Sequence, residues 1–257
     1  MPRVRDAALM LLFCVRQSTM PTGKPVMAFW RSVPITLAAM LPAVLVPQPV
    51  PAQDRPSVEA AVVFVVDVSV SMDSQERRFV RSAHADALTS APVLAAIANS
   101  TTGAIAAAYV EFDKGAHVAV PWRIIDGPSA AADFALGITE ARCGTCFRPT
   151  GIGEGLAAAW HLFGALPADT PRLVVDLVGD GPQNTGVPIA PARAALLEKG
   201  ATINALPLTD RPDLISSGEL ESFYREISGG PRSFAVPLTA IEQLPQILRQ
   251  KILLELF

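Results

Sequence analysis

Cysteine, histidine and tyrosine are scarce in this sequence of 257 residues. It contains three cysteines, three histidines and two tyrosines, and aromatic residues make up 6% of the chain. The sequence has no Gly-x-Ser-x-Gly nucleophile elbow and no Walker phosphate loop, and its histidines stand apart from any obvious nucleophile. It therefore gives little support to nucleophilic hydrolases or to enzymes that bind nucleotide phosphates.

Clusters of basic residues are also missing. The formal net charge is −3, with 21 Lys and Arg against 24 Asp and Glu. Residues 1–52 hold five of the basic and one of the acidic residues, which leaves 16 basic and 23 acidic residues in the rest. An acidic body without basic clusters or interleaved aromatic residues argues against nucleic acid as a partner.

A long uninterrupted apolar run is absent too, although the N-terminal part is rich in apolar residues. From Met27, a short segment with Arg31 leads into the apolar stretch 33–46 and then into Val50-Pro51-Ala52. That stretch is shorter than the roughly 20 residues that cross a bilayer, and two prolines interrupt it. These features are typical of a signal peptide that is cleaved after Ala52, so we expect no stable membrane insertion.

This interpretation divides the chain into a leader, a short linker and one domain, at residues 1–52, 53–57 and 58–257. The true start is either Met27 or, with an unusually long leader, Met1. We expect the mature protein to begin at Gln53 and to be periplasmic or secreted.

Export also bears on the cysteine pair in Cys143-Gly144-Thr145-Cys146. An oxidising compartment favours a disulfide between Cys143 and Cys146. A redox-active pair has the same spacing but usually opens a helix directly, whereas this pair precedes a loop. Zinc needs two further ligands, which the sequence does not identify. Free thiols and redox chemistry remain the alternatives to a structural bridge.

The domain alternates strands with helices. The predicted strands are 62–66, 104–112, 117–125, 173–178, 202–208 and 233–237. The predicted helices are 74–88, 129–141, 151–166, 190–199, 214–227 and 241 onward. Strands 104–112 and 117–125 flank a short turn and predict a hairpin. The alternation predicts an α/β fold, a doubly wound and mostly parallel sheet with helices on both faces and one antiparallel edge hairpin.

Asp67, Ser69 and Ser71 follow the first predicted strand, where sheets of this kind bind ligands. In an extended segment, alternate residues point the same way, so these three side chains can converge. A carboxylate and two hydroxyls form an all-oxygen set suited to Mg²⁺, Mn²⁺ or Ca²⁺ and unsuited to zinc or copper. The alternative is a group of helix N-cap residues, in which Ser and Asp are common.

Two further stretches strengthen the metal hypothesis. Arg148-Pro149-Thr150-Gly151-Ile152-Gly153 places a hydroxyl before a helix, and Asp176-Leu177-Val178-Gly179-Asp180-Gly181 places a carboxylate after a strand. With Asp67-x-Ser69-x-Ser71 they resemble the three-part metal-ion-dependent adhesion site of von Willebrand factor type A (vWA) domains. The resemblance covers residues 58–257, and the ordered trio is more specific than any one motif.

The chain resembles more closely an uncharacterised group of exported vWA-like proteins of Gram-negative bacteria. The residues that carry this likeness are Tyr109-Val110-Glu111, Pro121-Trp122, the run from Gly179 to Asn184, and Gly229-Gly230-Pro231.

The resemblance implies roles for five residues in holding a divalent metal. Ser69 and Ser71 would bind it directly, Thr150 directly or through water, and Asp67 and Asp180 directly or through bridging waters. One coordination place would remain for an Asp or Glu carboxylate of a partner protein. The function it implies is that of a non-enzymatic binding or adhesion module.

One feature departs from the vWA pattern. vWA domains often have two glycines before the threonine, where this chain has Arg148 and Pro149. Proline stiffens the loop and arginine adds a cation near the metal, which argues against an open-to-closed movement of Thr150.

An enzyme is the main alternative. The run from Gly179 to Asn184 also resembles the acidic loop of Mg²⁺-dependent phosphatases of the haloacid-dehalogenase type. Those enzymes need Asp-x-Asp, but Ser69 takes the second place and its hydroxyl cannot protonate a leaving group near neutral pH. Asn184 also stands where a second loop carboxylate is usual. A third hypothesis is an accessory scaffold protein in which the metal is structural.

Overall fold

The computed structural model describes residues 55–143, 146–209, 215–238 and 240–256. The predicted leader, the cleavage position after Ala52 and the start of the linker lie outside the described residues. None of the helices in the described ranges has the length and apolar character that crossing a membrane requires.

One five-stranded sheet forms the centre of the domain. Its strands are β1 (Ala61–Asp67), β2 (Ile105–Phe112), β3 (Ala116–Ile125), β4 (Leu173–Gly179) and β5 (Thr202–Pro207), in the spatial order β3-β2-β1-β4-β5. β1 pairs in parallel with β2 and β4, β4 pairs in parallel with β5, and β2 with β3 forms the antiparallel hairpin. The predicted doubly wound sheet and its edge hairpin are confirmed.

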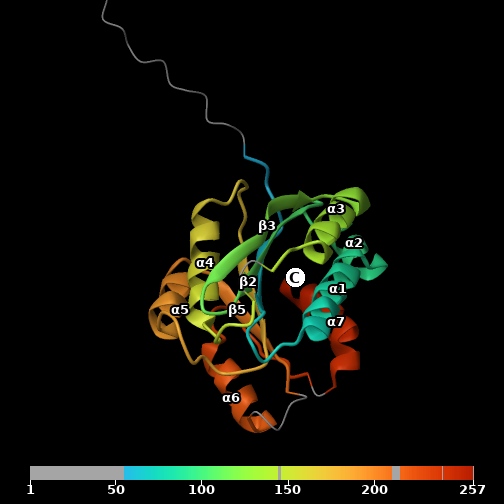
Figure 1. The fold of residues 1–257 in the computed structure, drawn as a ribbon. Helices are drawn as coiled ribbons and strands as arrows, with labels where there is room; N and C mark the ends of the chain where they lie inside the picture. Colours follow the sequence, from blue (N-terminus) through green and yellow to red (C-terminus); the bar gives the residue numbers. More distant parts are fainter. Residues whose placement is uncertain (1–54, 144–145, 210–214, 239, 257) are drawn as a thin grey trace, which may run out of the picture. The chain divides into compact units, whose positions relative to one another are not determined.

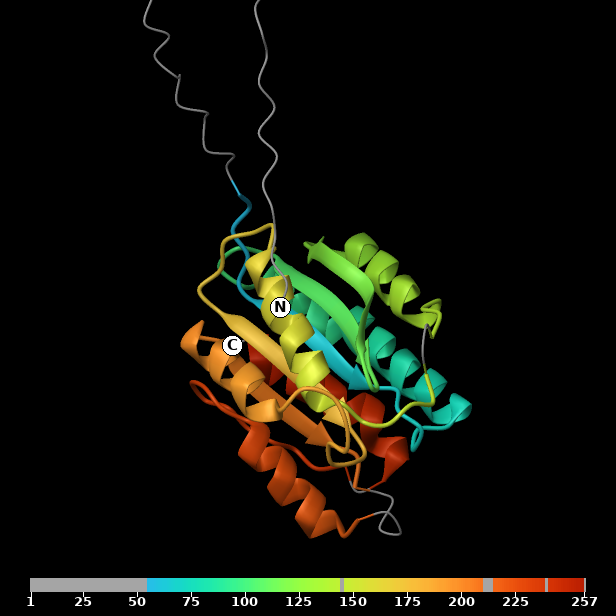
Figure 2. The ribbon, with the colours of Figure 1, turned by 60° about the vertical axis from the view of Figure 1, so that its left-hand side comes forward.

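Helices cover both faces of this sheet (Figure 1 and Figure 2). One face carries α1 (Ser74–Thr89), α2 (Ala91–Ala98), α3 (Pro128–Thr139) and α7 (Leu244–Leu256), the last preceded by a 3₁₀ turn, Ile241–Gln243. The other face carries α4 (Ile152–Gly164), α5 (Ile189–Glu198) and α6 (Ser217–Ile227).

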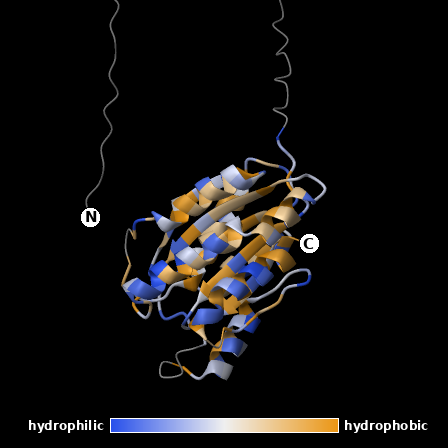
Figure 3. Cartoon of the chain, turned by 90° about the vertical axis from the view of Figure 1, so that its right-hand side faces the viewer, coloured by the Kyte–Doolittle hydropathy of each residue, from blue (hydrophilic) through white to orange (hydrophobic). Residues whose placement is uncertain are grey.

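The two faces bury separate apolar clusters, and β1 contributes to both because its seven residues are all buried. Phe64 and Val66 face the side of α1 and α7, while Val63 and Val65 face the side of α4. Figure 3 shows the apolar residues running along the strands and on the inner sides of the helices. A strand buried on both sides reads as a continuous apolar run, which is why the sequence predicts β1 well.

Two elements differ from the prediction. α2 was not predicted, and its short apolar sequence begins at Ser90-Ala91-Pro92, where the proline has the backbone angle of a first helical turn. The strand predicted at 233–237 is wrong as a regular strand. Ala235 forms only an isolated bridge with Ala205, and Leu238 another with Leu208.

Candidate metal site

Asp67 is the last residue of β1, at the boundary between the two halves of the winding. β2 lies on one side of β1 and β4 on the other, so Asp67 stands at the topological switch point of the sheet. Beyond it the chain turns, and the N–H of Met72 donates to the carbonyl of Ser69 at 3.1 Å. The extended geometry predicted for this segment is therefore wrong. The Ser69 N–H donates to Asp67 Oδ1 at 2.7 Å, so a turn rather than a strand brings these side chains together.

The five predicted metal ligands form one continuous group of oxygen atoms. Ser69 Oγ lies 3.1 Å from Ser71 Oγ, and Thr150 Oγ1 donates to Ser69 Oγ at 3.0 Å. Ser71 Oγ donates to Asp180 Oδ1 at 2.7 Å. Four of the five residues are buried, and Ser71 is half-buried, so the group opens to solvent beside Ser71.

Hydrogen bonds join the loop of Thr150 to the loops of the other candidate ligands. Its N–H donates to Asn184 Oδ1 at 2.8 Å, and its carbonyl accepts from the N–H of Asn184 at 3.0 Å. The N–H of Val70 donates to the carbonyl of Arg148 at 3.0 Å. The amide oxygen of Asn184 thus ties the loop of Asp180 to Thr150.

Arg148 forms a closed ion pair on the edge of the site. Its Nε and Nη2 donate to the two carboxylate oxygens of Asp113 at 3.0 and 2.8 Å, and Asp113 is buried. Asp113 also accepts from the N–H of Gly115 at 3.0 Å, a contact within the hairpin turn. The positive charge of Arg148 is therefore matched by a third carboxylate near the site, a contact that the sequence did not reveal.

Asp180 follows β4 directly, and a tyrosine lies underneath it. The hydroxyl of Tyr224, on α6, donates to the carbonyl of Gly181 at 3.2 Å. A Cβ added to Gly179 would lie 2.2 Å from the Tyr224 hydroxyl and 3.1 Å from Asp67 Oδ2, so only glycine fits between them. Burial, together with Asp67 and Asp180, raises the pKa of Tyr224 well above its usual value, and the residue stays a neutral donor.

The electrostatics of the group call for a cation. Burial and the nearby charge of Asp180 raise the pKa of Asp67 to about 8. Asp67 Oδ2 is buried and has no hydrogen-bond partner. A buried carboxylate oxygen without a partner is costly unless a positive charge or a donor faces it.

The donor set fits a hard divalent ion. Among the described residues, no group of three or more His, Cys, Asp or Glu side chains has the arrangement of a metal site. The candidate site has two carboxylates and takes its other oxygens from hydroxyls, a composition typical of Mg²⁺, Mn²⁺ or Ca²⁺ rather than of tetrahedral zinc.

The alternative reading as helix caps is excluded for the candidate ligands. The N-cap of α1 is Asp73, whose carboxylate accepts from the N–H groups of Gln75 and Glu76, and Glu76 returns the contact in a capping box. Asp67, Ser69 and Ser71 precede Asp73 and bond to one another and to the other two loops.

Cys143 and Cys146 lie immediately before the loop of Thr150. The structure pairs them, with Cα atoms 5.5 Å apart, a separation that a disulfide spans. Phe147 follows with a positive φ of 77°.

A second group of buried charges lies on the face covered by α7. Lys251 Nζ lies 2.5 Å from Asp176 Oδ1 and 2.5 Å from Glu255 Oε1, and all three residues are buried. Burial and Asp176 raise the pKa of Glu255 to about 8. Burial alone would lower the pKa of Lys251, but the two carboxylates reverse this and raise it. The Lys251 partner of Asp176 comes from a distant helix, and the sequence did not predict it.

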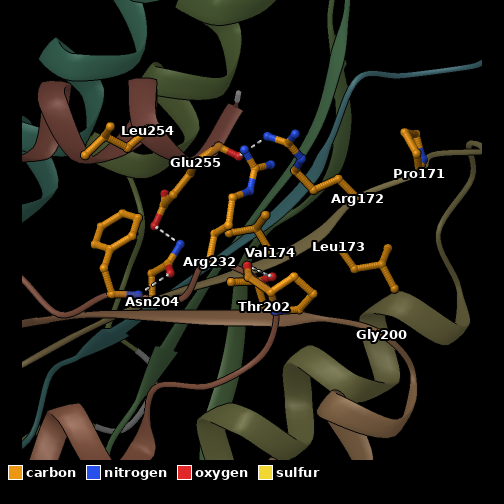
Figure 4. Close-up of a pocket in the computed structure, with 12 residues that line it drawn as sticks. Pro171, Arg172, Leu173, Val174, Gly200, Thr202, Asn204, Arg232, Leu254 and Glu255 are labelled. Carbon is orange, nitrogen blue, oxygen red and sulfur yellow. Dashed lines mark hydrogen bonds between the residues drawn. The ribbon is translucent and has the colours of Figure 1, made fainter.

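This second group borders a cavity of about 260 Å³ at the starts of β4 and β5, the ends remote from Asp67. In Figure 4 the Asn204 amide points to the Glu255 carboxylate, and Arg172 points to the Glu255 main chain. Arg172 Nη1 donates to the carbonyl of Glu255 at 3.2 Å, near the end of α7. The cavity is thus separate from the candidate metal site.

A family model described as "Protein of unknown function (DUF1194)" matches residues 57–257 of the chain. No curated protein matches the sequence.

Solved vWA structures are similar to the described domain. A von Willebrand factor type A protein from Catenulispora acidiphila is 17% identical, with a TM-score of 0.57 over 77% of this chain and 43% of that chain. Proximal thread matrix protein 1 from the mussel byssus, in a structure with a zinc-occupied MIDAS motif, is 22% identical, with a TM-score of 0.57 over 77% and 48%. The vWF domain of the type V pili tip protein Mfa5 from Porphyromonas gingivalis is 12% identical, with a TM-score of 0.52 over 76% and 94%.

These similarities establish the fold as that of a vWA domain, as the sequence predicted. The chain spans less than half the length of the first two of these proteins.

Proposed function

Because the chain belongs to the DUF1194 family of proteins of unknown function and has a vWA fold, we propose that it is a metal-dependent binding module. It works outside the cytoplasm, in the periplasm or as a secreted protein. It holds a divalent cation and captures an acidic side chain of a partner protein. The proposed ligands of the cation are Asp67, Ser69, Ser71, Thr150 and Asp180.

One observation carries this proposal: Asp67 is buried beside Asp180 in a group of hydroxyls, and one of its carboxylate oxygens has no hydrogen-bond partner. Burial and Asp180 raise the pKa of Asp67 to about 8, and its Oδ2 atom has no donor. A divalent ion would compensate both charges and offer a coordination place to a partner's carboxylate. Asn184 and Arg148 join the three loops that carry these ligands, which favours a fixed arrangement of the ligands around the ion.

A phosphatase is less consistent with these contacts. Ser69 takes the place of the general acid, and its hydroxyl lies between those of Ser71 and Thr150. A third carboxylate, Asp113, is already neutralised by Arg148. The site therefore has no carboxyl group at the position from which these phosphatases protonate a leaving alcohol.

The similar proteins support a binding role in general terms. Their names include a matrix protein of the mussel byssus and a pilus tip protein, and one was solved with zinc in its MIDAS motif. For this chain the partner carboxylate is what the vWA resemblance implies, and the donor set suits Mg²⁺, Mn²⁺ and Ca²⁺ alike. Zinc therefore belongs in the test as a competitor.

Thermal melts of the purified protein test the metal. With Mg²⁺ at a hundred times its dissociation constant, mass action should stabilise the fold by about 2.7 kcal/mol. Asp67→Ala should abolish this gain, whereas Asp133→Ala, which removes an exposed carboxylate on α3, should keep it. Identical melting in Mg²⁺, Mn²⁺, Ca²⁺, Zn²⁺ and EDTA would remove the metal site from the proposal.

Ser69→Asp separates binding from catalysis. It restores the carboxylate that a phosphatase requires and adds negative charge, so it should tighten metal binding without producing phosphate release from p-nitrophenyl phosphate. Turnover by this variant, or by the wild-type protein, would favour the enzyme. A metal-dependent melt with no metal-dependent capture of any carboxylate would favour a scaffold with a structural ion.

A further inference from the structure

Two large apolar side chains are exposed beside the loops that carry the proposed metal ligands. Val70 lies between Ser69 and Ser71 in the sequence and is 61% exposed. Phe147 lies three residues before Thr150 and is 59% exposed. A single exposed apolar residue is ordinary in proteins, so exposure alone means little. Their common position beside one site is the informative feature.

Hydrogen bonds and stacking bring the two side chains to the same surface. The N–H of Val70 donates to the carbonyl of Arg148, the residue after Phe147, at 3.0 Å. The guanidinium of Arg77 lies 4.0 Å from the centre of the Phe147 ring, and Arg77 also donates to the carbonyl of Met72. Phe147 is thus anchored to the turn of Val70. This surface is also where the half-buried Ser71 opens the site to solvent.

The backbone of Phe147 is strained, which sets this residue apart from an ordinary exposed aromatic. Its φ of 77° lies in the left-handed region that bulky residues rarely occupy and that glycine adopts freely. Backbone strain of this kind collects at functional sites. A glycine at this position would relieve the strain, so within the fold the ring is favoured by its stacking on Arg77 and disfavoured by its own backbone.

Charge balance explains why an apolar contact would be needed. The carboxylates of Asp67 and Asp180 together neutralise a divalent ion, and Arg148 is matched by Asp113. Apart from Arg77, which stacks on Phe147, the charges named at this face are therefore balanced within the site. Selectivity for one acidic segment over others must then come from the surface around the ion.

We propose that Val70 and Phe147 form an apolar rim of the metal face. The occupant is a protein segment in which an Asp or Glu lies next to a large apolar residue. This inference rests on the proposed metal site, because the carboxylate of the segment reaches the ion while its apolar neighbour covers Val70 and Phe147.

Synthetic decapeptides test the rim with the purified full chain. Each peptide carries a central Asp flanked by Leu or Phe on either side, and a matched set carries Ser at those positions. In Mg²⁺ the apolar-flanked set should bind at least about tenfold more tightly than the serine set, and EDTA should abolish binding. Equal affinity for the two sets, or no binding of either, would overturn the inference.

Variants separate the rim from the metal. Val70→Ser and Phe147→Gly should each weaken the apolar-flanked peptides by about tenfold while leaving the metal-dependent melting shift unchanged. Val118→Ser on β3 and Leu136→Ser on α3 remove exposed apolar residues elsewhere and should bind as the wild type does. Equal losses in these controls would contradict the rim.

Phe147→Gly gives a readout that a purely structural role would not produce. Because glycine tolerates the positive φ, the variant should melt no lower than the wild type although it binds less peptide. A lower melting temperature with normal peptide binding would make Phe147 a packing residue and overturn its part in the rim. The proposed metal site has its own test. If EDTA changes neither the melting temperature nor the peptide binding of the wild-type protein, the metal site is wrong whatever the variants show.

Discussion

The domain buries two pairs of carboxylates, and they differ in where the compensating charge comes from. Asp176 and Glu255 lie against Lys251, whose ammonium is within 2.5 Å of each. Asp67 and Asp180 lie among hydroxyls at the ends of β1 and β4, with Ser71 and Thr150 completing the group. One pair is closed by the chain itself, and the other lies where the fold opens to solvent.

This difference explains how the same residue types can have unrelated roles. A buried carboxylate with an internal lysine is satisfied within the fold and needs nothing from outside. A buried carboxylate oxygen without a hydrogen-bond partner, such as Asp67 Oδ2, is costly until a cation faces it, which links ion binding to folding. The lesson is that the surroundings of each carboxylate oxygen, more than the number of acidic residues, separate a structural cluster from a candidate site.

The largest effect should come from removing the internal cation. Lys251→Met leaves Asp176 and Glu255 buried without a counter-ion and should destabilise the fold by about 3–5 kcal/mol near pH 8. Denaturant melts measure the loss. Adding Asp176→Asn to this variant should restore much of the stability, and Lys199→Met, which removes an exposed lysine, should change little. A small loss of stability in Lys251→Met would mean that water reaches Asp176 and Glu255.

A lysine introduced at the metal site should make the pair of Asp67 and Asp180 behave like the pair of Asp176 and Glu255. Ser71→Lys, at the half-buried mouth of the site, places an ammonium within reach of Asp180, as Lys251 is placed beside Asp176. The magnesium gain of about 2.7 kcal/mol should then fall close to zero, while the metal-free protein becomes more stable at pH 8. Ser74→Lys, on the exposed start of α1, is the control and should keep the gain. An undiminished response in Ser71→Lys would place the ion elsewhere.

The pH dependence should distinguish the pairs more finely. Asp67 and Glu255 both have a pKa raised to about 8, so between roughly pH 4 and 8 the folded chain keeps protons that the unfolded chain has released. The free energy of unfolding of the metal-free protein should therefore fall as the pH rises through this window. Mg²⁺ should remove the part of this pH dependence that is due to Asp67 and leave the part that is due to Glu255.

Asp67→Asn provides the control for this measurement. In the absence of metal, this variant should lose the same part of the pH dependence of the free energy of unfolding that Mg²⁺ removes in the wild type. Its free energy of unfolding should not respond to Mg²⁺. Because the ion displaces the proton of Asp67, metal affinity of the wild type should also rise from pH 5 to pH 8. Affinity that does not change with pH would show that Asp67 is already ionised without metal.

The smallest expected effect concerns the cysteine pair near the loop of Thr150. Thiol labelling of the native mature protein should find no reactive cysteine at 143 or 146, because the two are paired. Since the closed ring is short, reduction should lower stability by no more than about 2 kcal/mol. Two labelled thiols in the native protein would refute the bridge.

The sequence determined the architecture and the set of candidate ligands. Alternation of buried strands with helices is a local, periodic property, so β1, β4 and the hairpin could be predicted from their own residues. The three motifs stand at strand ends and before a helix, and parallel strands bring such ends to one edge. These positions and the vWA resemblance together selected Asp67, Ser69, Ser71, Thr150 and Asp180 before their contacts were known.

Only the tertiary structure decided which charges meet. Lys251 reaches Asp176 across 75 positions of sequence, Asn184 bonds to Thr150, and Arg148 closes on Asp113. Periodicity fixes the face on which a residue lies but not its partner from another element, because helix placement and loop paths depend on packing of the whole domain. The same limit explains why neither the position of Tyr224 beneath the site nor the strained backbone of Phe147 could be predicted.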